Sequence, residues 1–270
     1  MNQSNEAARS LWEHRSVGYQ RANNAAEGSA TYFANLRQYR YGYETPFIPE
    51  TFNFKSLDGK RVLEIGVGNG IDAVTMMEHG AIYTGLDITK NHLQLARTFI
   101  EIENKTNQLE ALIEGDLLAV DVPAGFDVIY SFGVLHHIAH EDAYLTKLHA
   151  LLNGEGELRI ALYSKYSFFN AYLYASWIFK NRMRNSLNDW QSHVAELSDL
   201  GSPVTIKIRA KREVAQTLRR AGFKIIRYEK RGFVQNYIPV LGRKLAPNGN
   251  TLRIFASLLG WYHCFICRKA

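Results

Sequence analysis

Short apolar runs alternate with amphipathic segments from Arg61 onward. Arg61–Ile65 is an apolar run that ends at glycines, which predicts a buried parallel strand. Further strands are predicted at Ile82–Asp87, Ala111–Glu114, Asp127–Phe132, Glu157–Leu162, Lys224–Tyr228 and Trp261–Arg268. Helices are predicted at Ile71–His79, Asn91–Asn104, Glu141–Leu152 (with Gly154 as its stop) and Lys211–Ala221. Strands and helices that alternate at this spacing predict a doubly wound α/β sheet with mainly parallel strands.

Two further segments flank or interrupt this pattern. Residues 1–57 are polar, rich in Tyr and Asn, and helical in patterning, so we expect an N-terminal helical cover before a main domain at 58–270. The stretch 163–209 is too long for a plain connection and predicts a lid or substrate-binding insertion. Within it, Tyr166–Phe179 has no charge and is rich in aromatic residues, with Lys180, Arg182 and Arg184 behind it. This segment is either a helix packed on the core or on a partner chain, or a lid over an apolar substrate taken from a membrane surface.

The composition is that of a globular protein, with 270 residues of which 46% are apolar and 21% charged. No apolar run is long enough to span a bilayer, and no secretory signal is visible in the first residues. Cys264 and Cys267 are too few for a disulfide framework, and i, i+3 positions on a strand point to opposite faces. We therefore expect two ordinary strand cysteines and a cytoplasmic protein.

Charge is distributed unevenly along the chain. Residues 1–150 hold 12 basic and 19 acidic side chains, whereas residues 151–270 hold 20 basic and 7 acidic ones. The basic half indicates either a solvated face or a surface for an anionic partner such as nucleic acid, lipid or an acidic substrate. The excess is centred on Lys207, Arg209, Lys211, Arg212, Arg219 and Arg220.

The most informative motif is the glycine turn Gly66-x-Gly68-x-Gly70, which follows the first predicted strand. Glycines let the backbone turn sharply and approach a ligand closely, and the next helix offers free N–H groups. The spacing is neither the dinucleotide G-x-G-x-x-G nor a phosphate loop. Three acids stand at or near the ends of successive strands, where open α/β sheets bind ligands: Glu64, Asp87 and Asp116.

Four segments together resemble class I S-adenosylmethionine-dependent methyltransferases, in the broad group that includes quinone-biosynthesis enzymes. They are VLEIGVGNG (62–70), YTGLDIT (83–89), FDVIYSFGVLHHI (126–138) and LLNGEGELRIALY (151–163). The resemblance implies a Rossmann-like seven-stranded sheet in the order 3-2-1-4-5-7-6, with an antiparallel strand seven. It also implies S-adenosyl-L-methionine as the cofactor.

The resemblance further implies roles for single residues. Gly66, Gly68 and Gly70 would face the methionine part of the cofactor. Independently of the resemblance, Glu64 is a carboxylate inside an apolar strand, which needs partners such as loop N–H groups or a ligand ammonium. Asp87 would bind the ribose and Ile88 would lie beside the adenine, whose edge Asp116 and Leu117 would frame. Ser131, Phe132 and Gly133 would line the sulfonium end, and Tyr39 and Arg40 would reach the sulfonium or carboxylate from the N-terminal cover. For Asp72, in contrast, we expect a structural role only, the stabilisation of a helix N-terminus.

His136 and His137 follow the fourth strand, next to the expected methyl position. Either can act as the base that removes a proton from the acceptor, or it can serve loop packing or cofactor contact. His136, His140 and Glu141 have metal-like spacing, but the pattern offers no third convincing ligand, so no metal is expected.

The sequence therefore predicts methyl transfer to an O, N or C nucleophile of a small apolar, aromatic or lipid-like metabolite. An RNA or protein methyltransferase is the rival suggested by the basic half, although the Asn/Asp-Pro-Pro-aromatic motif of amino-methylating nucleic-acid enzymes is missing from SFGVLHH (131–137). A cofactor-binding protein without transferase activity, such as a partner subunit, is the third alternative. Transient contact with a membrane surface stays open, and the oligomeric state is not indicated.

Overall fold

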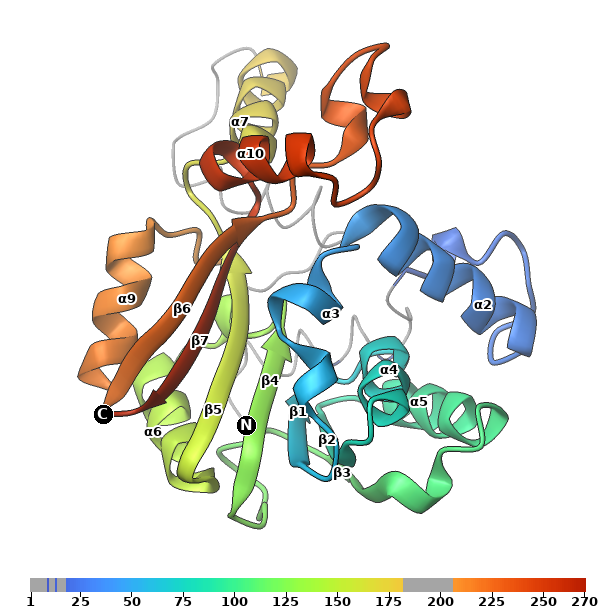
Figure 1. Cartoon of the computed structure of the whole chain (residues 1–270), viewed down its shortest axis with the longest axis vertical. Helices are drawn as coiled ribbons and strands as arrows, with labels where there is room; N and C mark the ends of the chain where they lie inside the picture. The colour runs from blue at the N-terminus through green and yellow to red at the C-terminus, as the bar shows by residue number, and fades with distance from the viewer. Residues whose placement is uncertain (1–8, 10–12, 14–17, 182–205) are drawn as a thin grey trace.

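One seven-stranded sheet forms the centre of the molecule (Figure 1). The computed structural model describes residues 9, 13, 18–181 and 206–270, so Arg182, Arg184 and much of the predicted insertion lie outside the described residues. The strand order is β3-β2-β1-β4-β5-β7-β6, and β7 runs antiparallel to both of its neighbours. The strands are β1 (Arg61–Ile65), β2 (Ile82–Asp87), β3 (Leu109–Glu114), β4 (Phe126–Phe132), β5 (Leu152–Tyr163), β6 (Phe223–Arg231) and β7 (Tyr262–Lys269). The predicted order and the antiparallel strand seven are confirmed.

Helices cover both faces of the sheet. Alternate residues of β1 serve the two cores, because successive side chains of a strand point to opposite faces: Val62 packs on one side, Leu63 and Ile65 on the other. The first face is covered by α4 (Ile71–Glu78) and α5 (Lys90–Ile102), and the second by α6 (Glu141–Leu151) and α9 (Lys211–Arg220). This alternation is the physical basis of the predicted doubly wound architecture.

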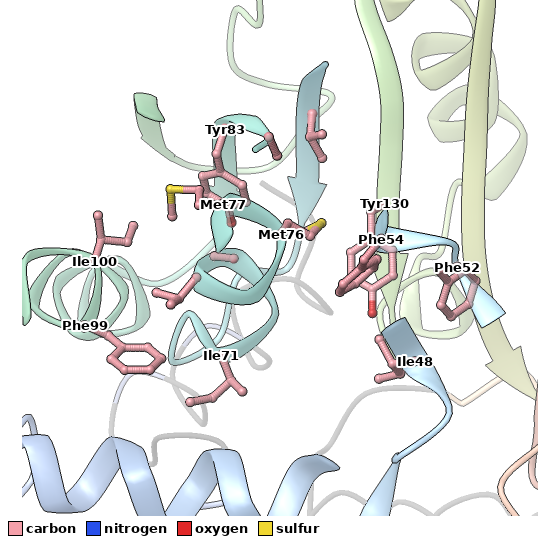
Figure 2. Packing of buried hydrophobic residues seen from close by; sticks show 14 of the residues in the cluster. Ile48, Phe52, Phe54, Ile71, Met76, Met77, Tyr83, Phe99, Ile100 and Tyr130 are labelled. Atoms are coloured by element: carbon pink, nitrogen blue, oxygen red, sulfur yellow. The ribbon is translucent and has the colours of Figure 1, made fainter. Parts of the chain in front are cut away.

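The N-terminal cover shares the core of the first face. It consists mainly of α2 (Ala30–Tyr39), the π-helical turn η2 (Arg40–Glu44), α3 (Ile48–Thr51) and the 3-10 turn η3 (Phe54–Ser56). Phe52 and Phe54 pack edge-on against Tyr130 of β4, with ring centroids 5.3 and 5.6 Å apart (Figure 2). Phe33 of α2 stacks on Phe99 of α5 at 4.5 Å. The cover is therefore anchored by buried aromatic contacts to both the sheet and the helical layer.

Two elements differ from the sequence prediction. Gly154 was predicted to stop a helix that reached Leu152, but α6 ends at Leu151 and Gly154 lies inside β5. Leu152 instead pairs with Phe126 of β4, so strand pairing begins where the helix ends. Helix α10 (Asn250–Leu259) was not predicted, although Leu252, Phe255, Ala256 and Leu259 have the i, i+3, i+4, i+7 spacing of an amphipathic helix.

Helices α7 (Phe168–Asn181) and α10 lie at the end of the molecule where the parallel strands terminate (Figure 1). Within the described part of the chain, no helix combines the length and apolar character needed to cross a bilayer. Cys264 and Cys267 are free, buried thiols of β7, as the sequence predicted. Burial raises the pKa of the Cys267 thiol to about 12.

Candidate active site

A cavity of about 650 Å³ opens at the carboxyl ends of β1, β2 and β4. This is the edge at which open α/β sheets bind ligands, and the volume lies in the usual range for small-molecule sites. Eleven of the residues predicted for the site line it: Tyr39, Arg40, Glu64, Gly66, Gly68, Asp87, Ile88, Asp116, Phe132, Gly133 and His137. Four other predicted residues are not part of its lining: Gly70, Leu117, Ser131 and His136.

The glycine turn joins β1 to α4, and a side chain at each of two of its glycines would clash with a different part of the fold. Gly66 has a φ of +82°, and a Cβ atom there would come within 2.2 Å of Val134. Gly70 has a φ of +80°, and a Cβ atom would lie 2.8 Å from the backbone of Ala96 in α5. The third glycine therefore permits close packing of α4 on α5, whereas Gly66 and Gly68 line the cavity.

Asp87 ends β2 with its carboxylate facing the glycine turn. One oxygen accepts the N–H of Gly68 at 3.1 Å, and the other accepts the N–H and hydroxyl of Thr89 at 3.0 and 2.9 Å. His92 Nδ1 lies 3.4 Å from the second oxygen. Burial pushes the pKa of Asp87 upward, but His92 and the N–H groups of Thr89 and Gly68 outweigh it and hold the pKa below its ordinary value. An ionised carboxylate is thus fixed in the cavity wall.

Arg40 and Asp72 form a buried ion pair across the cavity wall. The Arg40 Nε and Nη2 atoms donate to the two Asp72 oxygens at 2.8 and 2.5 Å, and the hydroxyls of Tyr41 and Tyr130 donate at 2.7 and 2.8 Å. Burial would raise the pKa of Asp72, but Arg40 and the two hydroxyls lower it. Asp72 thus does more than stabilise a helix N-terminus. The guanidinium that was predicted to meet a cofactor carboxylate is held by a carboxylate of the protein.

Glu64 also lines the cavity, and its pKa is shifted in the opposite direction to those of Asp87 and Asp72. It is almost fully buried, and it accepts the hydroxyl of Tyr83 at 2.5 Å. Burial, with the nearby charge of Asp72, raises its pKa well above the ordinary value. The cavity therefore presents an ionised Asp87 and a Glu64 whose ionisation is disfavoured by burial, and a bound cation would favour ionisation of Glu64.

The remaining predicted residues occupy several positions around the cavity. Asp116 lines it, and one carboxylate oxygen accepts the N–H of Leu118 at 2.9 Å. Leu117 is fully buried in the second core, and the Ser131 hydroxyl donates to the Ile65 carbonyl at 3.2 Å beneath the site. Tyr39 lines the cavity with the guanidinium of Arg21 over its ring, 4.7 Å from the centroid.

The two histidines are adjacent but have different access to the cavity. His137 lines it, and burial lowers its pKa to about 4. His136 is fully buried and stacks on Tyr163 at 3.8 Å, and within the described structure neither of its ring nitrogens has a hydrogen-bond partner. Burial, then the charges of His137 and Arg209, lower its pKa well below the ordinary value. Both rings are neutral near pH 7, and of the two His137 alone is placed to accept a proton from a molecule in the cavity.

An aromatic wall lines the cavity as well; the sequence indicated Phe132 and the segment that contains Phe169, but not Tyr163, Trp261 or Tyr262. Tyr163 of β5 stacks on Trp261 at 4.4 Å, and Phe169 of α7 meets Trp261 edge-on at 5.0 Å. Phe132 and Tyr262 lie 4.8 Å apart. These residues come from β4, β5, α7 and the start of β7, so only the folded sheet brings them together.

Several side chains of the basic cluster predicted from the sequence (Lys207, Arg209 and Lys211) make contacts within the fold and do not line the cavity. Arg209 forms two hydrogen bonds with Glu141, at 2.8 and 2.6 Å, and Lys207 Nζ donates to the Ile138 carbonyl at 2.7 Å. Lys211 lies over the ring of Tyr228 at 3.8 Å. None of the six clustered cations is part of the cavity lining found in the described chain. The predicted steering of an anionic substrate stays a prediction.

Comparison with known proteins agrees with this geometry. A family model described as a methyltransferase domain matches residues 63–158, the part that holds the glycine turn, Asp87, Asp116 and both histidines. This part of the chain is a methyltransferase domain of the class I S-adenosylmethionine-dependent type. The methyltransferase match ends within β5, before the aromatic wall is complete.

The curated relatives match only part of this chain. It is 31% identical over 122 residues to the ubiquinone biosynthesis O-methyltransferase of Vibrio atlanticus, a match covering 45% of this chain and 50% of that protein. The enzyme of the same name from Coxiella burnetii is 28% identical over 53% of this chain and 62% of its own. The chain therefore spans about half to three fifths of the length of these relatives.

Solved structures resemble the chain over a greater length. Magnesium protoporphyrin IX methyltransferase from Synechocystis, solved with bound SAH, has a TM-score of 0.61 at 13% identity and covers 99% of this chain and 100% of its own. A methyltransferase from Mesorhizobium loti has a TM-score of 0.56 at 17% identity and covers 83% and 97%. At these identities the likeness establishes the fold.

Proposed function

We propose that this protein transfers the methyl group of S-adenosyl-L-methionine to an O, N or C nucleophile of a small aromatic or apolar acceptor. The observation that carries the proposal is one continuous cavity with two chemically different ends. Asp87, Asp116 and the glycine turn form its polar end, and the aromatic wall forms its other end. An adenosyl cation fits the first end, and a flat apolar molecule fits the second.

The residues at the polar end suit the cofactor. Asp87 is ionised and would accept the ribose hydroxyls, while the backbone of Gly66 and Gly68 allows close approach of the methionine part. Glu64 and Asp87 supply negative charge, or the capacity for it, to balance a sulfonium and an ammonium group. When bound, the cofactor supplies an activated methyl group whose transfer needs chiefly an aligned nucleophile.

At the other end the protein would orient the acceptor and receive its proton. The rings of Phe132, Tyr163 and Trp261 offer flat apolar surface for an aromatic acceptor. His137 is neutral at pH 7 and lines the cavity, so it can accept a proton from a hydroxyl or amine. The relatives of the ubiquinone biosynthesis group, which are named O-methyltransferases, support an oxygen nucleophile.

Product analysis tests the proposal against a cofactor-binding protein without transferase activity. The protein is incubated with S-adenosylmethionine and a panel of phenols, catechols and aromatic amines, and S-adenosylhomocysteine and methylated products are both quantified. A transferase releases the two in equal amounts with at least one acceptor class. Cofactor binding without a methylated product from any class contradicts the proposed transfer to small aromatic acceptors.

A further inference from the structure

Glu64 lines the cavity, although its position in the sheet leaves it almost no access to water. It is the fourth residue of β1, it lies between β2 and β4, and it is 3% exposed. Within the described chain its one hydrogen bond comes from the hydroxyl of Tyr83, which donates to Oε2 at 2.5 Å. A buried carboxylate needs a cation or several donors, so this environment suits a carboxyl group that carries a proton.

The arginine on the same wall of the cavity is engaged by other carboxylates. The Nε and Nη2 atoms of Arg40 donate to Asp72, and its Nη1 atom lies 3.7 Å from Glu44. In the part of the chain that the structure describes, Glu64 forms no ion pair of its own. One guanidinium therefore serves a wall that three carboxyl groups line, and Glu64 is the one left without a paired cation.

The groups around Glu64 differ in whether they favour its protonated or its ionised form. Burial has the largest effect and raises its pKa, and the carboxylate of Asp72 raises the pKa next. The Tyr83 hydroxyl and Arg40 lower it, whereas Asp87 raises it. The raising effects prevail, so the pKa of Glu64 stands well above its ordinary value. A ligand cation beside Glu64 would oppose them, because an opposite charge favours the ionised carboxylate.

We propose that Glu64 holds a proton in the ligand-free protein and releases it when a cationic group binds beside it in the cavity. The O–H bond of the carboxyl group breaks, the proton goes to solvent, and the carboxylate that remains pairs with the cation of the ligand. One positive charge enters the buried site and one leaves it, so the net charge of this wall is unchanged. Ligand binding is thereby coupled to pH through a single side chain.

The coupling would distinguish the two forms of the cofactor, and it rests on the proposed function because the cofactor supplies the cation. S-adenosylmethionine carries a sulfonium and an ammonium group, whereas S-adenosylhomocysteine retains only the ammonium. Glu64 is therefore ionised more completely when the first is bound. By linkage, a ligand whose binding releases more protons gains more affinity as pH rises. Rising pH would then favour the methyl donor over the demethylated product, which limits product inhibition.

Titration calorimetry of the full chain in buffers of different ionisation enthalpy counts the protons released on binding. The ligands form a charge series: S-adenosylmethionine, S-adenosylhomocysteine and 5′-methylthioadenosine, which lacks both cationic groups. Because the ligand amino group also exchanges protons, each count is compared with that of Glu64→Gln. Near pH 7 the wild type should release up to about one more proton than Glu64→Gln with S-adenosylmethionine. The excess should be smaller with S-adenosylhomocysteine and absent with 5′-methylthioadenosine.

A second measurement does not depend on the folding of a variant. Infrared difference spectra of the wild type should lose the carbonyl band of a protonated carboxyl group when S-adenosylmethionine is added, but not when 5′-methylthioadenosine is added. The exposed Glu101→Gln of α5 is the matched control in calorimetry and should release protons as the wild type does. Circular dichroism confirms that both variants are folded.

The outcomes separate this inference from the proposed function. Equal proton release by the wild type and Glu64→Gln with S-adenosylmethionine, or an unchanged carbonyl band, overturns the proposal for Glu64 and leaves methyl transfer intact. The same excess with all three ligands also overturns it, because the release would then not depend on ligand charge. Failure of the folded wild type to bind either form of the cofactor contradicts the proposed function, on which this inference rests.

Discussion

Arg40 and Asp72 join the N-terminal cover to the helix that leaves the glycine turn. Two hydrogen bonds connect them, and the hydroxyls of Tyr41 and Tyr130 complete the shell of the buried carboxylate. Since Asp72 is in the first turn of α4 and Arg40 begins the π-helical turn, this pair fixes one wall of the cavity relative to another. The cover is therefore electrostatically coupled to the candidate cofactor site.

Replacing only Arg40 of this ion pair should lower the free energy of unfolding strongly. Arg40→Gln leaves the buried Asp72 charge without its cation, and we expect a loss of about 3–5 kcal/mol of unfolding free energy in urea titrations. The double variant Arg40→Gln/Asp72→Asn keeps hydrogen-bonding atoms and removes both charges, so it should lose clearly less than the sum of the two single variants. Additive losses would show that the two side chains are not coupled.

Gly70→Ala should destabilise the fold more than Gly133→Ala. Both positions have a positive φ, near +80°, and share a backbone cost of ~1–2 kcal/mol for a residue with a Cβ. At Gly70 the new atom also meets the backbone of Ala96, whereas at Gly133 no atom lies within 4 Å. Thermal and urea unfolding should show an additional loss of ~1–3 kcal/mol for Gly70→Ala. Equal losses would contradict the close packing of α4 on α5.

Replacing each histidine by Phe should separate proton transfer from packing. His137→Phe removes the neutral imidazole that lines the cavity, so kcat should fall by ~10²–10⁴-fold with little change in cofactor affinity. His136→Phe replaces a buried ring whose nitrogens have no partner in the described structure, so stability and kcat should be retained. Unchanged turnover in both variants would show that neither histidine is the base.

Lowering the pH should reduce the free energy of unfolding of the wild type, because His137 is buried in its neutral form. Its pKa is about 4 in the folded protein and near 6.5 when unfolded, so the unfolded chain binds more protons between these values. Stability from the neutral ring is complete above about pH 6.5 and is lost as pH falls toward about 4. Between about pH 7 and about pH 4.5 the wild type should lose roughly 2 kcal/mol more than His137→Phe in urea titrations. Parallel curves would show a solvated His137.

Local patterns were sufficient to predict most of the fold. Both Arg61–Ile65 and Ile82–Asp87 were predicted with the bounds that the structure shows, because a buried parallel strand reads as a continuous apolar run that ends at turn residues. Gly154 was misassigned because a glycine after a helix also occurs inside a strand, and only the pairing of Leu152 with Phe126 decides the case.

Site residues that belong to one continuous motif could be predicted from the sequence, whereas contacts between segments far apart in the sequence could not. Gly66, Gly68 and Asp87 were found through their position at strand ends, and the structure places all three on the cavity. The partner of Arg40 and the stacking of Tyr163 on Trp261 depend on contacts between residues far apart in sequence. The sequence also did not show which side chains reach the cavity: Ser131 was predicted to line it but is buried.

Titration calorimetry with S-adenosylhomocysteine tests the central claim, that the turn after β1 and the carboxylate at the end of β2 hold the adenosyl cofactor. The wild type should bind at micromolar ligand, and Asp87→Ala should weaken binding by ~1–3 kcal/mol through lost hydrogen bonds. The exposed Asp121→Ala is the matched control and should bind as the wild type does. No binding by the folded wild type, or equal affinity in the wild type and Asp87→Ala, would contradict the account.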